Sequence, residues 1–333
     1  MMQRALAAAC AVLICSCAPQ ALDPGEQWRA LEVAAEPFTL QQEQVGLLRF
    51  RGGLVLLSDD YAFGGISDIE VLDDGRLLAI SDNGDWFELQ LELDASGALV
   101  GVNSVRTAFM RDENGRPFAT KRDGDSEDLA QLPDGRFAVS FEQTQTIRIY
   151  DFNRDGPFGA AKRGPVLADV QRLHRNAGLE AMAATEDGML LVGAEGGETE
   201  TTPLWLAPVD DQTPAPMRIG YPPARGYSLT GLDRLPDGGF VALERFYAPV
   251  VGARGRITMF TSAQLNAGAE TLPGLVVLAE LAPPLPVDNF EGVTAVRMSD
   301  GATRIYVISD DNFSRRQRTL LYAFDISSAA PSR

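Results

Sequence analysis

Five acidic residues recur at one position of a repeated pattern, and together they could bind a cation. Each follows the second of two apolar runs that an Asp-Gly pair separates, and the five are Asp82, Glu142, Glu195, Glu244 and Asp310. A second set is expected just before the first strand of each unit: Ser67, Glu127, Glu180, Thr230 and Glu291. Carboxylates that gather in one place must either hold protons, with raised pKa values, or bind a positive ion.

The elements that carry these residues are predicted to be β-hairpins. An Asp-Gly pair between apolar runs favours a hairpin because the turn needs a positive φ. The five glycines, Gly75, Gly135, Gly188, Gly238 and Gly301, are spaced so that each interval holds about four strands of ordinary length. No stretch shows sustained helical periodicity. Four-stranded units that repeat radially are the blades of an all-β propeller.

A propeller must close its ring, and the two ends of the chain offer the strands to do so. Runs at 45–50 and 53–57 are free to pair with C-terminal runs at 304–308 and 319–326, which would hide the sheet edges. The motif count gives five blades, and a sixth could be assembled from the two termini. Because the innermost strands line the central channel, the repeated acids are expected to converge there.

Ligands that are all oxygen atoms favour Ca²⁺ or Mg²⁺ in this acidic channel. No cysteine follows Cys17, and His174 is the single histidine, so a zinc site of the usual kind cannot be built. Ca²⁺ is favoured because its flexible coordination suits carboxylates, amides and carbonyls. The predicted metal ligands are Asp82, Glu142, Glu195, Glu244, Glu291 and Asp310. Neighbouring amides either add ligands or shape turns, and these are Asn83, Asn176, Asn289 and Asn312.

The charge and the missing motifs exclude other functions. A formal net charge of −17, from 46 acidic and 29 basic residues, argues against nucleic-acid binding. His174 is the only histidine that a Ser-His-Asp triad could contain, and the sequence has no G-x-S-x-G motif, which forms the nucleophile elbow of such hydrolases. His174 precedes the third unit and could face the site, although a lone loop histidine is more often incidental.

The N-terminus resembles an export signal. Arg4 precedes a short apolar run at 5–14, and the stretch 14–17 resembles a bacterial lipobox with Cys17 as the lipidated residue. An ordinary signal peptide cut nearby is the alternative. We expect a lipoprotein signal peptide at 1–16, a tether at 17–36, a propeller at 37–327 and a tail at 328–333. Ala18 after the cysteine favours anchoring to the outer membrane, on the periplasmic side, and we expect a monomer.

Several motifs together resemble the phytase-like proteins known for "esterase-like activity of phytase". The resemblance covers about 47–326 and rests on the stretches 63–67, 81–86, 140–142, 176–181, 243–245, 288–292, 309–313 and 317–321. It implies a propeller, and distant kinship with calcium-dependent β-propeller phytases, which favours six blades. Those enzymes hold Ca²⁺ in an acidic channel and hydrolyse phosphomonoesters. This chain departs from them in having only two lysines, Lys121 and Lys162.

Phosphate binding would therefore fall to arginines, which grip phosphate in a bidentate manner. The candidates are Arg245, Arg315, Arg316 and Arg318, unless they pair with nearby acids. The sequence predicts a Ca²⁺-dependent hydrolase of phosphate or other esters, with a small-molecule substrate. Its predicted catalytic residues are Glu127, Glu180, Glu244 and Arg245, with one glutamate as general base. The alternatives are a non-catalytic ligand- or partner-binding propeller of the envelope and a lactonase-type hydrolase.

Overall fold

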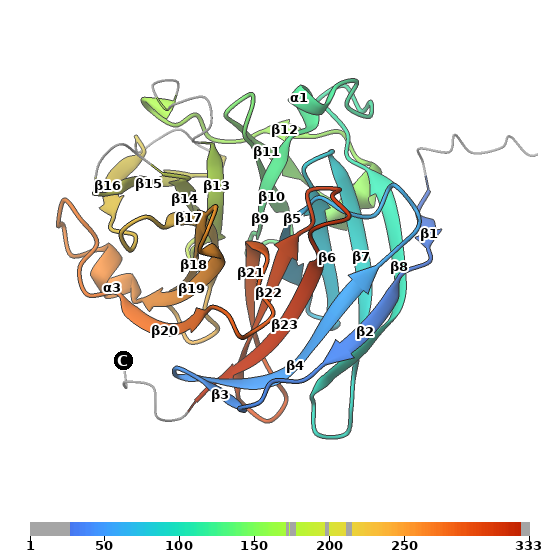
Figure 1. The fold of residues 1–333 in the computed structure, drawn as a ribbon. Coiled ribbons are helices and arrows are strands. Elements are labelled where there is room, and N and C mark those ends of the chain that lie inside the picture. Colours follow the sequence, from blue (N-terminus) through green and yellow to red (C-terminus); the bar gives the residue numbers. More distant parts are fainter. Residues whose placement is uncertain (1–26, 171–172, 174–177, 197–199, 211–214, 328–333) are drawn as a thin grey trace, which may run out of the picture.

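A computed structural model describes residues 27–170, 173, 178–196, 200–210 and 215–327. The expected signal peptide at 1–16, Cys17, the tail at 328–333, His174 and Asn176 lie outside the described residues. Within them, no helix is both long and apolar enough to cross a membrane. The chain folds into five antiparallel sheets arranged around a common axis, with their innermost strands near the middle of the view in Figure 1.

Each sheet is one blade, and its strands run outward from the channel in chain order, except that N-terminal strands form the outer edges of blades 1 and 5. Blade 1 has β5 (Ile66–Val71), β6 (Arg76–Ser81), β7 (Asp85–Leu93) and β8 (Leu99–Phe109), with β1 (Arg29–Leu31) at its outer edge. Blade 2 has β9 (Ser126–Gln131), β10 (Phe137–Phe141), β11 (Thr146–Tyr150) and β12 (Lys162–Arg163). Blade 3 has β13 (Leu179–Ala184), β14 (Met189–Ala194), β15 (Thr202–Pro208) and β16 (Met217–Tyr221).

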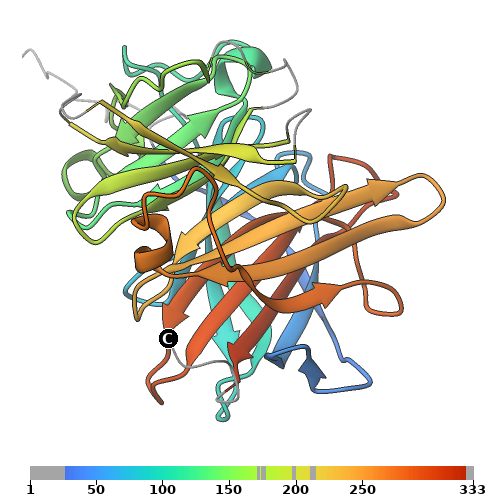
Figure 2. The same ribbon diagram turned by 90° about the vertical axis from the view of Figure 1, so that its left-hand side faces the viewer.

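The last two blades contain a projecting hairpin and the closure of the ring. Blade 4 has β17 (Ser228–Arg234), β18 (Phe240–Ala248), β19 (Gly252–Phe260) and β20 (Val276–Leu281). Blade 5 has β21 (Asn289–Arg297), β22 (Thr303–Asp310), β23 (Thr319–Ile326), β4 (Leu48–Leu57) and β2 (Ala34–Phe38), with β3 (Gln44–Val45) paired to β4. Short helices lie in the connections: α1 (Lys121–Gly124), α2 (Phe152–Asp155), η2 (Gly156–Phe158) and α3 (Ser262–Leu265). The β18–β19 hairpin projects from the body at the right of Figure 2.

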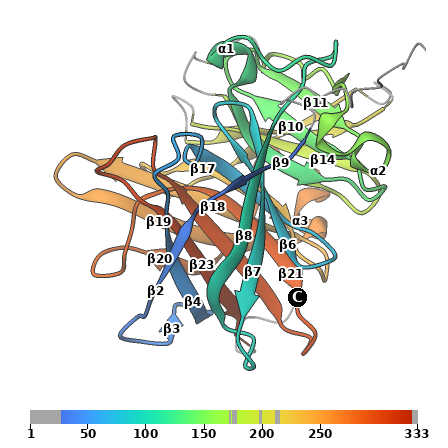
Figure 3. The ribbon, with the colours of Figure 1, turned by 90° about the vertical axis from the view of Figure 1, so that its right-hand side faces the viewer.

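The ring closes with five blades, which corrects the sixth blade that the family resemblance favours. The innermost strands contact one another in the order β5, β9, β13, β17, β21 and back to β5. The expected terminal pairing is present, because β4 pairs antiparallel with β23, so that Leu54 lies opposite Leu321 (Figure 3). The N-terminal strand therefore supplies the fourth strand of blade 5, since the fifth repeat provides only three strands of its own.

The core is divided among the blade interfaces. Five clusters of buried apolar side chains each join two adjacent blades among the described residues. Neighbouring positions of one strand face different clusters: Leu77 and Ala79 pack toward blade 5, whereas Leu78 and Ile80 pack toward blade 2. Each sheet is thus buried on both faces, which explains why its strands read as continuous apolar runs.

The propeller begins earlier than the predicted boundary at residue 37. Part of the expected tether forms strands, because β1 pairs with β8 and β2 pairs with β4. These strands extend the outer edges of two blades and leave fewer unpaired backbone groups there. The rest of that segment, residues 17–26, lies outside the described residues.

Candidate functional site

A β-bulge recurs at one place in all five innermost strands and sets the direction of the repeated residues. The register between the first and second strand of every blade shifts there, for example between Ile66 and Asp68 in blade 1. The residues at the bulges include Ser67, Glu127, Glu180, Thr230 and Glu291. A bulge re-aims side chains, so the residues at this place depart from the regular alternation of the strand.

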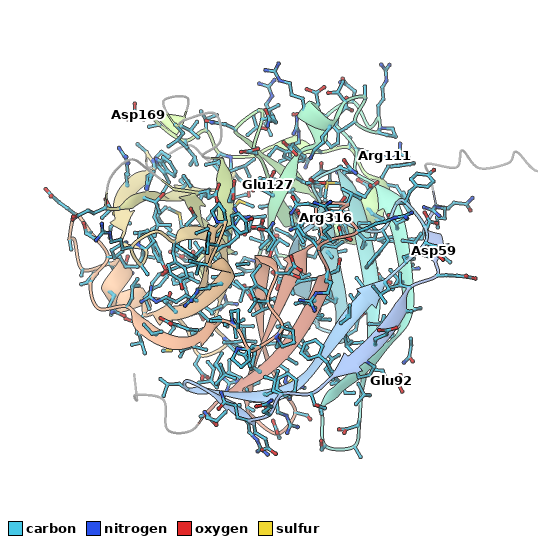
Figure 4. All side chains as sticks on the ribbon, in the orientation of Figure 1. Asp59, Glu92, Arg111, Glu127, Asp169 and Arg316 are labelled. Atoms are coloured by element: carbon cyan, nitrogen blue, oxygen red, sulfur yellow. The ribbon has the colours of Figure 1, made fainter. Side chains whose placement is uncertain are left out.

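Three carboxylates of blade 2 form the tightest acidic group at the channel mouth. Ligand oxygens of Asp125, Glu127 and Glu142 all lie within 4.8 Å of one another. Asp125 comes directly before β9, Glu127 lies in β9, and Glu142 comes directly after β10. The backbone N–H of Glu142 donates to the carbonyl oxygen of Asp125 (3.0 Å), which fixes the two ends side by side. Glu127 lies near the centre of the molecule in Figure 4.

Burial and mutual repulsion act on this carboxylate group. Burial raises the pKa of Glu127 well above its ordinary value, and the charges of Asp125 and Glu142 raise it further. Burial also raises the pKa of Glu142, with added repulsion from Asp125 and Glu195. Carboxylates in this state gain from any positive ion placed among them, because the ion removes the need to hold protons.

A lysine links this group to blade 1. The Nζ of Lys121, on helix α1, lies 2.6 Å from Oδ1 of Asp125 and 2.9 Å from Oδ2 of Asp82. Burial raises the pKa of Asp82, and the ion pair with Lys121 opposes that rise. Asp82, a predicted metal ligand, is therefore already paired with a cation in this structure.

An arginine occupies the opposite half of the mouth. Arg245 donates from Nη2 to Oε1 of Glu195 (2.6 Å) and from Nη1 to Oδ1 of Asn289 (2.6 Å) and to Glu291. Burial would lower the pKa of Arg245, but the surrounding carboxylates, Glu291 first, raise it above its ordinary value. Arg245 bridges blades 3, 4 and 5, and its ion pairs with Glu195 and Glu291 do not match the predicted role of an open phosphate clamp.

Three further carboxyl groups of the mouth have strongly shifted pKa values. Burial raises the pKa of Glu291 to about 8, against the opposing charge of Arg245. Burial raises the pKa of Asp310 to about 7, while the N–H of Asn312 donates to its Oδ1 (2.7 Å) and opposes the rise. Burial also raises the pKa of Glu180 well above its ordinary value, with repulsion from Glu195 and Glu127.

Glu244 does not belong to the mouth, which argues against both roles predicted for it. Its carboxylate is fully buried between blades 3 and 4 and accepts hydrogen bonds from Nη1 of Arg256 (2.8 and 2.7 Å), the hydroxyl of Tyr221 (2.7 Å) and the N–H of Ala224 (3.0 Å). The strand explains this difference, because β18 continues to Ala248. Strand alternation therefore holds Glu244 on the face toward blade 3.

Some of the predicted arginine and asparagine contacts belong to the site, and others do not. Arg318 pairs with Asp288, whereas Arg315 and Arg316 are exposed and have no ion pair among the described residues. Asn289 belongs to the Arg245 network, and Asn312 forms a turn with a φ of 48°. Of the six predicted metal ligands, only Glu142 lies in the tight carboxylate group, together with Glu127, which was predicted as catalytic.

Asp125 and Lys121 are the site residues that the sequence reasoning missed. Asp125 stands two residues before Glu127, at the position that Gly65 holds in blade 1 and Gly178 in blade 3. Each of these residues accepts a backbone hydrogen bond from the acid that follows the second strand. Only a comparison of all five repeats at that position would have shown that blade 2 has an extra carboxylate.

The fold and site together define a five-bladed β-propeller with an acidic, cation-competent channel mouth. A family model described as "Phytase-like: Esterase-like activity of phytase" matches residues 61–313, and the chain belongs to this family. This confirms the resemblance seen in the sequence motifs. No curated protein matches the sequence.

Solved structures resemble the fold at low sequence identity. The major allergen Mala s 1 of Malassezia sympodialis has a TM-score of 0.45 at 14% identity, covering 90% of this chain and 96% of the allergen. A gluconolactonase of Xanthomonas campestris has a TM-score of 0.45 at 11% identity, covering 91% of this chain and 99% of that one. A virginiamycin B lyase of Staphylococcus aureus has a TM-score of 0.40 at 8% identity, covering 84% of this chain and 87% of the lyase.

Proposed function

We propose that this protein is a divalent-cation-dependent hydrolase of anionic esters that acts at the channel mouth. The observation that carries the proposal is the group of Asp125, Glu127 and Glu142, whose ligand oxygens lie within 4.8 Å of one another. Membership of a family named for esterase-like activity supports the same chemistry.

The balance of charge at the mouth favours a bound cation over protons alone. The carboxyl groups gathered there are Asp82, Asp125, Glu127, Glu142, Glu180, Glu195, Glu291 and Asp310, and the bases among them are Lys121 and Arg245. Lys121 pairs with Asp125 and Asp82, and Arg245 pairs with Glu195 and Glu291, so the mouth holds more acidic groups than bases. Oxygen ligands of this kind suit Ca²⁺. A divalent cation held there supplies Lewis-acid chemistry that polarises the ester and offsets developing negative charge.

Glu180 is the side chain best placed to move a proton. Burial, with repulsion from Glu195 and Glu127, raises its pKa well above the ordinary value and so favours the protonated carboxyl group. We assign to it the donation of a proton to the oxygen of the leaving alcohol as the ester bond breaks. The carboxylate that remains takes up the proton released by the attacking water, so that the overall reaction is hydrolysis.

Two arginines favour a substrate with negative charge. Arg315 and Arg316 lie in the β22–β23 connection, whose Asp311 accepts a hydrogen bond from the N–H of Gly65 (3.1 Å) beside the site; Figure 4 labels Arg316. Phe313 of the same connection packs on Gly65, where a Cβ would lie 2.3 Å from its ring. Exposed guanidinium groups without ion pairs suit a phosphate or carboxylate on the substrate.

The test is hydrolysis of a panel of an aryl phosphate, an aryl ester with a carboxylate, a neutral aryl ester and a lactone. We expect the anionic esters to be hydrolysed with Ca²⁺ and not with a chelator, and Glu180→Gln to lower kcat on the order of a hundredfold. The exposed variant Asp59→Asn is the control. If the protein binds Ca²⁺ but hydrolyses no compound of the panel, the propeller is a binding module and the proposal fails.

We also propose that Cys17 anchors the protein by a lipid to the outer membrane, with the propeller on the periplasmic side. The support is the sequence pattern at 1–18, which lies outside the described residues. Radiolabelled fatty acid should be incorporated into the wild type and not into Cys17→Ala. Equal labelling of both, or labelling of neither, would contradict the anchor.

A further inference from the structure

The channel contains a second acidic group beyond the mouth, formed by Asp68, Glu70, Asp128 and Asp233, here called the deep carboxyls. All four are buried, with 1%, 8%, 0% and 9% of their surfaces exposed. Asp68 and Glu70 lie two residues apart on β5 and so share the face toward the channel. Asp128 and Asp233 lie on the innermost strands β9 and β17.

Asp128 lacks the partners that a buried carboxylate requires. Neither of its oxygens accepts a hydrogen bond of ordinary geometry from the part of the chain that the structure describes, although the amide of Met182 lies near. The charges that act on it most strongly are those of Asp68 and Asp233. A fully buried polar group without a partner costs free energy, and a buried charge costs far more unless it is paired or binds a metal.

The carboxyl groups of Asp68 and Asp233, which act on Asp128, accept hydrogen bonds from backbone amides. Oδ2 of Asp68 accepts the N–H of Leu129 (2.9 Å) in blade 2, and Oδ1 accepts the N–H of Val293 (3.2 Å) in blade 5. Both oxygens of Asp233 likewise accept amides, from Arg234 (2.5 Å) and from Ala295 (2.6 Å). Amide donors favour the ionised carboxylate, and each oxygen keeps a lone pair for another partner.

Burial raises the pKa of all four carboxyl groups, and the surroundings supply little positive charge to oppose the rise. Arg234 is the base whose charge acts on Glu70 and Asp233. The charges that act most strongly on Asp68 and Asp128 are those of other carboxyl groups. A cavity of about 670 Å³ opens at the end of the channel with the Asp-Gly turns, opposite the mouth, and Glu70 and Asp233 line it. Ions can therefore reach Glu70 and Asp233, the outer two of the deep carboxyls, without passing the mouth.

We propose that the deep carboxyls bind a divalent cation, held between Asp68 and Asp128 and separate from the cation of the mouth. Its oxygen ligands would tie blades 1 and 2 together at the axis of the ring, where Asp68 already joins blades 2 and 5. This inner site does not depend on the proposed hydrolysis.

The test counts bound ions by equilibrium dialysis with Ca²⁺ at neutral pH. We expect about two ions per chain in the wild type, and about one in each of Asp128→Asn and Asp125→Asn, because each variant removes one carboxylate ligand. The exposed variant Asp59→Asn should bind as many ions as the wild type. Full ion binding by Asp128→Asn would overturn the deep site and leave the mouth site untouched.

A measurement on the wild type covers the case in which Asp128→Asn does not fold. Crystals grown with Mn²⁺ should show an anomalous difference peak between Asp68 and Asp128. A peak at Asp125, Glu127 and Glu142 with none at Asp128 would overturn the deep site alone. A deep peak with none at the mouth would support this inference and count against the proposed function.

Discussion

Acids at one position of the repeat have three different environments. Glu142 joins Asp125 and Glu127, Glu195 pairs with Arg245, and Glu244 is fully buried against Arg256. The repeat predicts where an acid stands in the chain, but the partner that meets it comes from another strand. The residues that decide the outcome, Lys121, Arg245 and Arg256, follow no repeat, so the sequence could predict an acidic mouth and not its pairing.

If the proposed cation binds at the blade 2 carboxylates, Lys121 competes with it, because its ammonium group lies 2.6 Å from Oδ1 of Asp125. Replacing it with methionine removes a like charge beside the bound cation and frees that oxygen. We expect Lys121→Met to tighten Ca²⁺ binding on the order of tenfold, as measured by calorimetric titration. Weaker binding in this variant would mean that Lys121 positions Asp125 rather than competing for it.

Glu244 supports the fold and not the site. In Glu244→Gln, the guanidinium of Arg256 stays buried without a counter-charge, and we expect the free energy of unfolding to fall by about 3 kcal/mol. Denaturant titration measures this loss, with the exposed variant Glu92→Gln as control. The number of Ca²⁺ ions bound by folded Glu244→Gln should equal that of the wild type. A lost ion in that variant would restore Glu244 as a ligand.

At the scale of elements, the bulge and the strand end determine where a side chain points. Strand β10 ends at Phe141 and β14 ends at Ala194, so Glu142 and Glu195 are free to turn toward the channel. Strand β18 instead continues past Glu244 into the projecting hairpin. The Asp-Gly turns were predictable, and Gly75 has the expected positive φ of 81°. The bulges were not predictable, because they depend on the register between two strands.

Strand β7 begins with a carboxyl group that makes stability depend on pH. Burial raises the pKa of Asp85 from 3.8 to about 7, although the charge of Arg29 opposes the rise. As pH increases, the unfolded chain loses this proton first, so the stability that protonated Asp85 contributes is present below pH 3.8 and is lost through about pH 7.

The variant Asp85→Asn mimics the protonated group at every pH. We expect it to melt at a higher temperature than the wild type at pH 8, and the difference to shrink as the pH falls through 7 and to vanish below 3.8. Scanning calorimetry at a series of pH values measures this. A difference that is constant with pH would show that Asp85 is ionised throughout.

At the scale of the molecule, five repeats make five blades because the N-terminal strand completes the last one. The sequence predicted the propeller, the five units and the terminal pairing of 45–57 with 319–326. Kinship with six-bladed phytases pointed to one blade too many. The number of blades depends on how the inner strands pack around the axis, which the spacing of Asp-Gly turns cannot reveal by itself.

Ring closure should make the propeller unfold as one unit. Strand β4 joins β2 to β23, and Leu54 and Leu56 are buried in the cluster between blades 5 and 1. A chain that starts after residue 58 exposes the edge of β23 and lacks Leu31, Leu54 and Leu56 of that cluster. We expect it to lose the sharp thermal transition, whereas a chain that starts at residue 27 keeps it. A sharp transition in the shorter chain would show that closure by β4 is dispensable.

The most direct test of the central claim compares cation binding with hydrolysis in the same protein. Initial rates on an anionic aryl ester are measured across free Ca²⁺ concentrations, alongside a binding titration, for the wild type and Glu142→Gln. The account predicts that the rate rises with occupancy of the blade 2 carboxylates. Both curves should shift together to at least tenfold higher Ca²⁺ in the variant, because a ligand carboxylate is lost. A hydrolysis rate that does not change when Ca²⁺ is chelated would contradict it.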